Sequence, residues 1–264
     1  MPYLVCRSGP HQSRMSDKEA DVSNAIDEKA LSQAAESMRS ALREYSQLVQ
    51  QIAGPALSGL TIFGDVLDAG FNPSHGAAAS ALVLERMDLN MLRGLAEHGP
   101  MLGRKHITAP FITTPDYIAR SLDSFPLEFM EIHQRHATLC GRDHFAELEF
   151  SPQHVRLQCE REFKRVLIRL RQGLLAAAGR EAVLGHLRWD ISLHLLRTLS
   201  GVLWLKGETR HLPREQILAE SEKLLGGPLA GVRAAILHRG EHDWAEFTAL
   251  YNDVEKLAKV ADEL

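Results

Sequence analysis

The chain has 264 residues and a formal net charge of −4, with 45% hydrophobic and 24% charged residues. This balance is ordinary for a folded soluble protein and gives no reason to expect nucleic acid as the main partner. The three cysteines, Cys6, Cys140 and Cys159, have no paired spacing. They argue against a disulfide framework or a cysteine-based zinc site, and they favour a reducing compartment, the cytoplasm.

The N-terminal region predicts a tail followed by a long helix. Residues 1–22 are polar and irregular and are expected to be flexible. From Ser23 to Ile52, apolar residues recur at every third or fourth position, which is typical of an amphipathic helix, and Gly54-Pro55 is expected to end it. The periodicity leaves open whether this helix packs on its own domain or on a second subunit, and a protein partner or a homodimer is possible.

Short β-capable runs then predict a small sheet. The expected strands are Leu60–Phe63, Ala81–Leu84, His106–Thr113 and Leu127–Ile132. The third run contains a proline, so an edge or a bulge is expected there. In the fourth run apolar and acidic residues alternate, which would place Glu128 and Glu131 on opposite faces of a strand and argues against a shared metal. Helices are expected over Leu89–Ala96 and after the capping pair Thr114-Pro115.

From Ser151 onward the sequence predicts helices almost throughout. The first begins at Ser151-Pro152 with one continuous apolar stripe, and the next, Glu181–Lys206, is apolar on most sides. Arg188, Asp190 and Arg197 interrupt that second helix, and charges at this density are too costly for a membrane span. Shorter helices are expected over Pro213–Leu225, Pro228–His238 and Asp243–Leu264. The sequence therefore predicts an α+β domain over residues 23–150 and an all-α bundle over residues 151–264.

The most informative motif lies in Leu60–Leu84. Phe63-Gly64 ends the first expected strand, and Phe71-Asn72-Pro73 precedes the second. A glycine turn at the head of a strand lets backbone N–H groups approach phosphates, because no Cβ obstructs them. Two carboxylates one residue apart on a strand point to the same face and can share a Mg²⁺ ion.

On these residues the chain resembles the nucleotidyltransferase superfamily. The segments 125–132, 136–149 and 157–173 also resemble a group of bacterial proteins in which such a domain precedes a helical one. The resemblance implies a small mixed sheet with helices, then a helical bundle, with a nucleotide and Mg²⁺ as ligands. The chain departs from the family where the metal-binding Asp-x-Asp pair is expected, because that pair falls on Ala77 and Ala79.

The leading interpretation is a nucleotidyltransferase-fold protein without metal-dependent catalysis, which acts as a binding, regulatory or assembly module with weak nucleotide binding. The candidate nucleotide contacts are Gly64 and Asp65 at the turn, and Arg156 and Lys164 on the helix after Ser151. No catalytic residue and no metal ligand are assigned, and no membrane is expected as a partner.

Two other interpretations remain open. In the first, the chain is an active enzyme that uses ATP and Mg²⁺ to transfer a nucleoside monophosphate to a small molecule or protein, with Asp65, Asp68 or Glu128 as unusual ligands. In the second, it is a helical interaction protein with an accidental likeness. His133-x-x-His136 would suit a transition metal if helical, but no recognised spacing of further ligands accompanies it.

Overall fold

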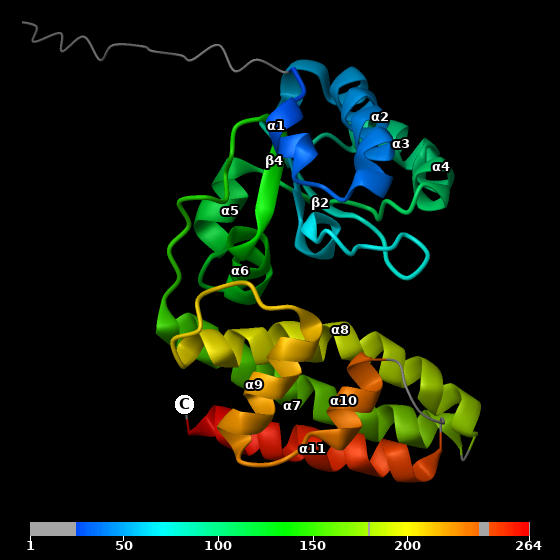
Figure 1. The fold of residues 1–264 in the computed structure, drawn as a ribbon, viewed down its shortest axis with the longest axis vertical. Coiled ribbons are helices and arrows are strands. Elements are labelled where there is room, and N and C mark those ends of the chain that lie inside the picture. The colour runs from blue at the N-terminus through cyan, green and yellow to red at the C-terminus, as the bar shows by residue number, and fades with distance from the viewer. Residues whose placement is uncertain (1–24, 179, 238–242, 264) are drawn as a thin grey trace, which may run out of the picture.

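The computed structural model describes residues 25–178, 180–237 and 243–263 (Figure 1). We call residues 25–150 the sheet part and residues 151–263 the helical part. The two parts lie at opposite ends of the long axis (Figure 1). The strand His136–Gly141 and the loop after it lead from the sheet part into the helix Pro152–Ala177 of the helical part. The tail predicted over residues 1–22 lies outside the described residues, and the division at residue 150 stays a prediction.

A four-stranded sheet in the order β3-β2-β1-β4 forms the centre of the sheet part. The central strand β1 (Leu57–Phe63) pairs antiparallel with β2 (Ala79–Leu84) and with β4 (His136–Gly141). The edge strand β3 (Phe111–Thr113) runs parallel to β2. The predicted edge position of the proline-containing run is therefore confirmed, but β3 starts only after Pro110, since proline has no N–H for the ladder.

The strand predicted over Leu127–Ile132 is wrong, because this segment forms helix α6 (Pro126–Gln134) with proline at its start. Leu127 and Met130 pack into the core of the helical part, whereas Phe129 and Ile132 pack against the sheet. A short helix buried on two sides has apolar residues on both, and over six positions this resembles the alternation of a strand. The strand beside β1 is β4 instead, which the sequence analysis did not predict.

Helices cover both faces of the sheet. One face carries the helices α1 (Glu28–Ser32), α2 (Glu36–Ala53), α3 (Leu89–Glu97) and α4 (Gly99–Arg104), and the other carries α5 (Pro115–Ser121) and α6. Side chains of β2 alternate between the faces, so that Leu82 packs under the first group and Val83 under the second. The predicted Thr114 cap of α5 is confirmed, since its hydroxyl accepts a hydrogen bond from the Tyr117 N–H at 3.2 Å.

The single long helix predicted from Ser23 to Ile52 is wrong, because the chain forms α1 and α2 with a break at Gln33–Ala35. Ala35 is not helical, with φ −50° and ψ 134°, and its N–H donates to the carbonyl of Val66 at 2.9 Å. This bond ties the break to the turn that follows β1. Within the described residues, both helices pack on the sheet of their own chain.

The helical part contains α7 (Pro152–Ala177), α8 (Glu181–Leu205), α9 (Arg214–Leu225), α10 (Ala230–Ile236) and α11 (Trp244–Asp262). The predicted helices are confirmed here with small shifts of their ends, and the predicted ends at His238 and Leu264 lie outside the described residues. They share one apolar core, to which α7 contributes Val155, Cys159 and Phe163. Of the helices that the structure describes, none combines the length and the apolar character needed to cross a bilayer.

Candidate functional site

A pocket of about 490 Å³ lies between the sheet part and the helical part. One side is formed by α6, the C-terminal end of β1 and the N-terminal end of β2, and we call these two adjacent strand ends the strand head. The other side is formed by α8, the linker after it and the start of α9. The polar and strand-head residues that line it include Gly64, Asp65, His75, Ala77, Ala79, Glu131, Arg197, His211 and Arg214. The pocket therefore brings together segments that are far apart in the sequence.

The glycine turn is where the sequence predicts it, at the end of β1. Gly64 has a φ of +74°, and a Cβ there would meet nothing within 4 Å, so the backbone conformation rather than space requires glycine. A short 3₁₀ turn (η2, Gly64–Leu67) follows. The N–H of Gly64 donates to the carbonyl of Arg135 at 3.1 Å. Because that donor already has a protein partner, a phosphate could use it only by displacing the bond.

Ala77 and Ala79 both line this pocket, beside the Gly64 turn. Ala79 is the first residue of β2 and pairs with Phe63, the last residue of β1. Positions two apart along an extended chain share a face, so one side of the strand head presents two methyl groups to the pocket. Methyl groups offer no ligand to a metal ion.

The basic residues in the pocket lining are paired with acidic ones. Arg214 donates to the Asp65 carboxylate at 3.2 Å, which links α9 to the Gly64 turn. Arg197 of α8 donates to Glu131 of α6 at 2.7 Å. The lining therefore holds two guanidinium groups against two carboxylates, and its formal charge is balanced.

Glu128 and Glu131 lie on one face of α6, contrary to the prediction of opposite faces, because residues three apart on a helix are neighbours. Both carboxylates bind Arg197, and Glu128 does so at 3.2 Å while also accepting from Gln158 at 2.7 Å. Burial alone would lower the pKa of Arg197, but the charges of Glu131 and Glu128 outweigh it and raise that pKa. Glu128 is therefore engaged in holding α6 to α7 and α8.

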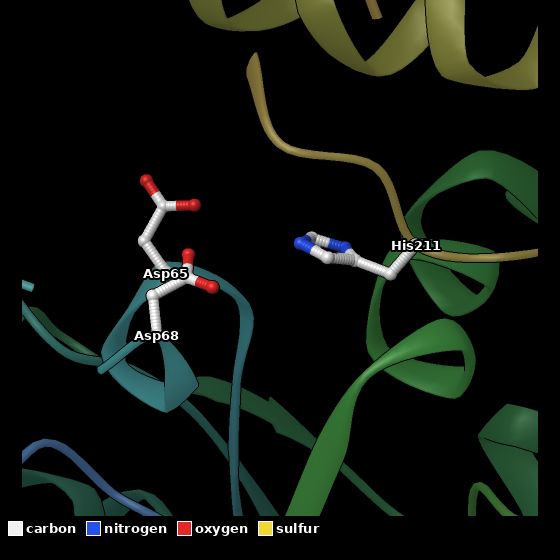
Figure 2. A group of neighbouring side chains, drawn as sticks. All are labelled: Asp65, Asp68 and His211. Carbon is white, nitrogen blue, oxygen red and sulfur yellow. The ribbon is translucent and has the colours of Figure 1, made fainter. Parts of the chain in front are cut away.

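Asp65, Asp68 and His211 form a second feature at the edge of the pocket. One ligand atom from each lies within 4.8 Å of the others. Figure 2 shows the two carboxylates on the turn after β1, with the outer nitrogen of the His211 ring pointing toward them from the linker between α8 and α9. Asp68 also accepts a hydrogen bond from Arg135. Sequence reasoning named both aspartates but missed His211, since no local pattern connects it to them.

The His211 imidazole is half-buried. Its Nε2 atom is buried and has no hydrogen-bond partner among the described residues. Burial lowers the pKa of His211, the charge of Arg135 adds to this, and the carboxylates of Asp68, Asp65 and Glu131 oppose it. A lowered pKa favours the neutral ring, in which one nitrogen carries a lone pair.

The four predicted nucleotide contacts do not come together. Gly64 and Asp65 line the pocket, whereas Arg156 and Lys164 are not part of its lining. Arg156 pairs with Glu160 at 3.2 Å, and Lys164 pairs with Glu160 at 2.6 Å and with Asp262 of α11 at 2.7 Å. The basic side chains that the fold brings to the pocket are Arg197 and Arg214.

His133, His136 and His144 bind other groups. The Nδ1 atom of His133 donates to the Phe145 carbonyl at 2.8 Å, and Nε2 of His144 lies 3.0 Å from the Ser58 hydroxyl. His136 lies between the His133 carbonyl at 3.2 Å and the Asp143 carboxylate at 3.0 Å. Carbonyl and carboxylate oxygens only accept, so this arrangement favours the imidazolium form, in which both nitrogens of His136 donate.

The His136–Asp143 pair predicts a pH-dependent part of the stability. Burial would lower the pKa of His136, but the bond and the charge of Asp143 raise it. Burial would raise the pKa of Asp143, but bonds from His136, Phe145 and Ala146 lower it to about 2. The stability from His136 is present below its unfolded pKa of about 6.5 and is lost as pH rises through the folded value. The stability from Asp143 is present above about 3.8 and is lost as pH falls toward about 2.

We therefore expect Asp143→Asn to cost more unfolding free energy at pH 5.5 than at pH 8.5, with a difference on the order of 1 kcal/mol because Asp143 is partly exposed. Urea unfolding of both proteins at the two pH values measures it. Asp116→Asn is the matched control, because Asp116 and its partner Arg120 are both well exposed. Equal costs at the two pH values would show that His136 carries no extra proton in the folded state.

Sequence comparison matches the chain to no protein family and to no curated protein. The fold does match solved structures, among them that of spectinomycin adenyltransferase AAD(9) from Enterococcus faecialis with ATP and spectinomycin. The two chains are 9% identical, with a TM-score of 0.54, and the match covers 85% of this chain and 99% of the other. At this identity the likeness concerns the fold alone. The chain has a nucleotidyltransferase-like fold, a small mixed sheet with helices followed by a helical region, as the sequence predicts.

Proposed function

We propose that the chain is a binding module that holds a nucleotide in the pocket between the strand heads and α8–α9, and that it does not catalyse metal-dependent nucleotidyl transfer. The observation that carries this proposal is the pair of methyl groups, Ala77 and Ala79, facing the pocket beside the Gly64 turn. The fold likeness to an adenyltransferase whose structure holds ATP supports the choice of a nucleotide.

The charges of the pocket support weak binding. A nucleoside triphosphate carries several negative charges, and the guanidinium groups of Arg197 and Arg214 are already paired with carboxylates. The phosphates must compete with those carboxylates, and no metal ion at the strand head offsets the repulsion from Asp65. We expect a dissociation constant for ATP on the order of 0.1–1 mM.

A second cavity, of about 540 Å³, fits a nucleotide less well. It lies against α3, α4 and the approach to β3, and it adjoins the first pocket at Ala77 and Thr108. Its lining is largely hydrocarbon and contains no lysine or arginine. Phosphate groups would therefore find no lysine or arginine there, so we propose that the nucleotide binds in the pocket with the two arginines.

The second candidate function is an active nucleotidyltransferase with unusual ligands. Asp65 and Asp68 favour it because they lie close together beside the pocket. Glu128 does not, because its two carboxylate oxygens bind Arg197 and Gln158. The two candidates differ in a measurable way, since only the enzyme requires Mg²⁺ for tight binding and transfers a labelled nucleoside monophosphate.

Calorimetry with ATP, with and without Mg²⁺, tests the proposal. We expect weak binding that changes little with Mg²⁺, and no transfer of label from α-labelled ATP to the protein or to added small-molecule acceptors. The double variant Ala77→Asp/Ala79→Asp restores an acidic pair on one face of the strand head. We expect this variant to bind ATP at least about tenfold more tightly with Mg²⁺ than without it.

The control variant is Ala69→Asp/Ser74→Asp, which adds the same charge at exposed positions of the same loop but outside the pocket lining. It is expected to bind ATP weakly with or without Mg²⁺. Tight Mg²⁺-dependent ATP binding by the unaltered chain would overturn the proposal in favour of the enzyme. Undetectable ATP binding by the unaltered chain at millimolar concentration would exclude ATP as the ligand.

A further inference from the structure

The strongest unassigned feature of the described residues is the cluster of Asp65, Asp68 and His211. Its members come from two parts of the fold, since both aspartates follow β1 and the histidine lies between α8 and α9 (Figure 2). Their ligand atoms lie within 4.8 Å of one another. Metal–ligand bonds to carboxylate and imidazole are about 2.0–2.2 Å long, which places ligand atoms roughly 3–4 Å apart. Small side-chain rotations would therefore bring the three groups onto one ion.

His211 distinguishes this cluster from an ordinary group of surface carboxylates. Its Nε2 atom is buried and has no hydrogen-bond partner among the residues that the structure describes. A buried polar atom without a partner costs free energy, and coordination of an ion would satisfy it. The outer ring nitrogen, which is Nε2, points toward the two carboxylates (Figure 2).

The two arginines beside the cluster do not have to leave when an ion binds. Arg135 donates to one oxygen of Asp68, and Arg214 donates to one oxygen of Asp65 at 3.2 Å. A carboxylate has two oxygens, so the other one remains available to a metal ion. Hydrogen bonds of this kind orient the ligating carboxylates in many metal sites.

We propose that Asp65, Asp68 and His211 form a binding site for a divalent transition-metal ion of the Zn²⁺ class. Imidazole suits zinc and its first-row neighbours, whereas Mg²⁺ prefers oxygen ligands alone. The ion joins the turn after β1 to the linker before α9 and so ties the sheet part to the helical part. This site is separate from the strand-head positions Ala77 and Ala79, and it does not rest on the proposed nucleotide function.

Zn²⁺ titration of the full chain after treatment with a chelator, without nucleotide, tests the proposal. We expect calorimetry to show a Zn²⁺ site at least about tenfold tighter than any Mg²⁺ binding. Co²⁺ is expected to give visible d–d absorption at the same site. The melting temperature is expected to rise with Zn²⁺, because the ion binds only the folded arrangement of both parts.

The decisive variants are His211→Ala and Asp65→Asn. Each is expected to weaken Zn²⁺ binding at least about tenfold and to abolish the rise in melting temperature. His211→Ala removes no hydrogen bond at Nε2, so its metal-free melting curve should remain cooperative and close to that of the unaltered chain. His75→Ala is the matched control, an exposed histidine that lines the same pocket but lies outside the cluster.

Zn²⁺ binding that is unchanged in both decisive variants would overturn the proposal, because the ion would then bind elsewhere. Loss of binding in His75→Ala as well would also overturn it, since the cluster would not be the specific site. Absence of Zn²⁺ binding by the unaltered chain would do the same. Asp65 and His211 also line the nucleotide pocket, so the Zn²⁺ titrations are made without nucleotide and the ATP titrations on chelator-treated protein, and failure of one proposal is then seen separately from failure of the other.

Discussion

Replacing Phe163 by alanine is expected to lower the free energy of unfolding by about 3–5 kcal/mol. Phe163 lies on α7 with 0% exposure, inside the core that the helices of the helical part share with Leu127 and Met130 of α6. The substitution removes an aromatic side chain from a close-packed interior and leaves a cavity that the helices can close only in part. Urea unfolding followed by circular dichroism measures the loss.

Ile168→Ala is the matched control on the same helix, because Ile168 is 52% exposed. Its cost is expected to stay below about 1 kcal/mol. A Phe163→Ala variant no less stable than Ile168→Ala would show that the core of the helical part is packed differently. The result also matters for the pocket, since α6 forms part of its wall and is anchored in this core.

Replacing Gly231 by alanine is expected to cost about 3 kcal/mol, although alanine is the better helix former. A Cβ at Gly231 of α10 would lie 2.1 Å from the Leu250 nitrogen and 2.3 Å from the Ala249 carbonyl carbon of α11. Both are backbone atoms, so the two helices would have to separate. Separation would also lengthen the hydrogen bond from the Gly231 N–H to the Asp253 carboxylate, now 2.8 Å. Urea unfolding again gives the magnitude.

Gly103→Ala provides the comparison for this variant. Gly103 lies in α4, and a Cβ there would meet nothing within 4 Å. Helix propensity alone then predicts a gain in stability of up to about 1 kcal/mol. Opposite signs for the two glycine substitutions are the expected result, and a stabilising Gly231→Ala would contradict the close approach of α10 and α11.

Nucleotidyl transfer requires both a glycine turn and a metal site, and the function proposed above keeps the first without the second. The glycine turn needs only a residue that tolerates a positive φ, and Gly64 meets this need. The metal site needs carboxylates at the strand head, and Ala77 and Ala79 do not supply them. Two acidic groups lie instead on the turn itself, Asp65 in the pocket lining and Asp68 beside it, and His211 makes their cluster better suited to a transition metal than to Mg²⁺.

Features that depend on neighbours along the chain were predictable from the sequence. These are the helices of the helical part, the Thr114 cap and the glycines that end α2 and β1. Each follows from a local period or from the backbone preference of one residue. Ala77 and Ala79, where the count from Gly64 puts the expected Asp-x-Asp pair, line the pocket, and their replacement of that pair stays a prediction.

Features that depend on contacts between distant segments were decided only by the tertiary structure. Burial of α6 on two sides made a helix resemble a strand, and the bond from Ala35 to Val66 divided a periodic segment into two helices. The same holds for the site, where Arg197, His211 and Arg214 reach the pocket while Arg156 and Lys164 do not. Periodicity in the sequence records which face of a segment is apolar. It does not record which other segment covers that face, and that choice is made by packing over the whole chain.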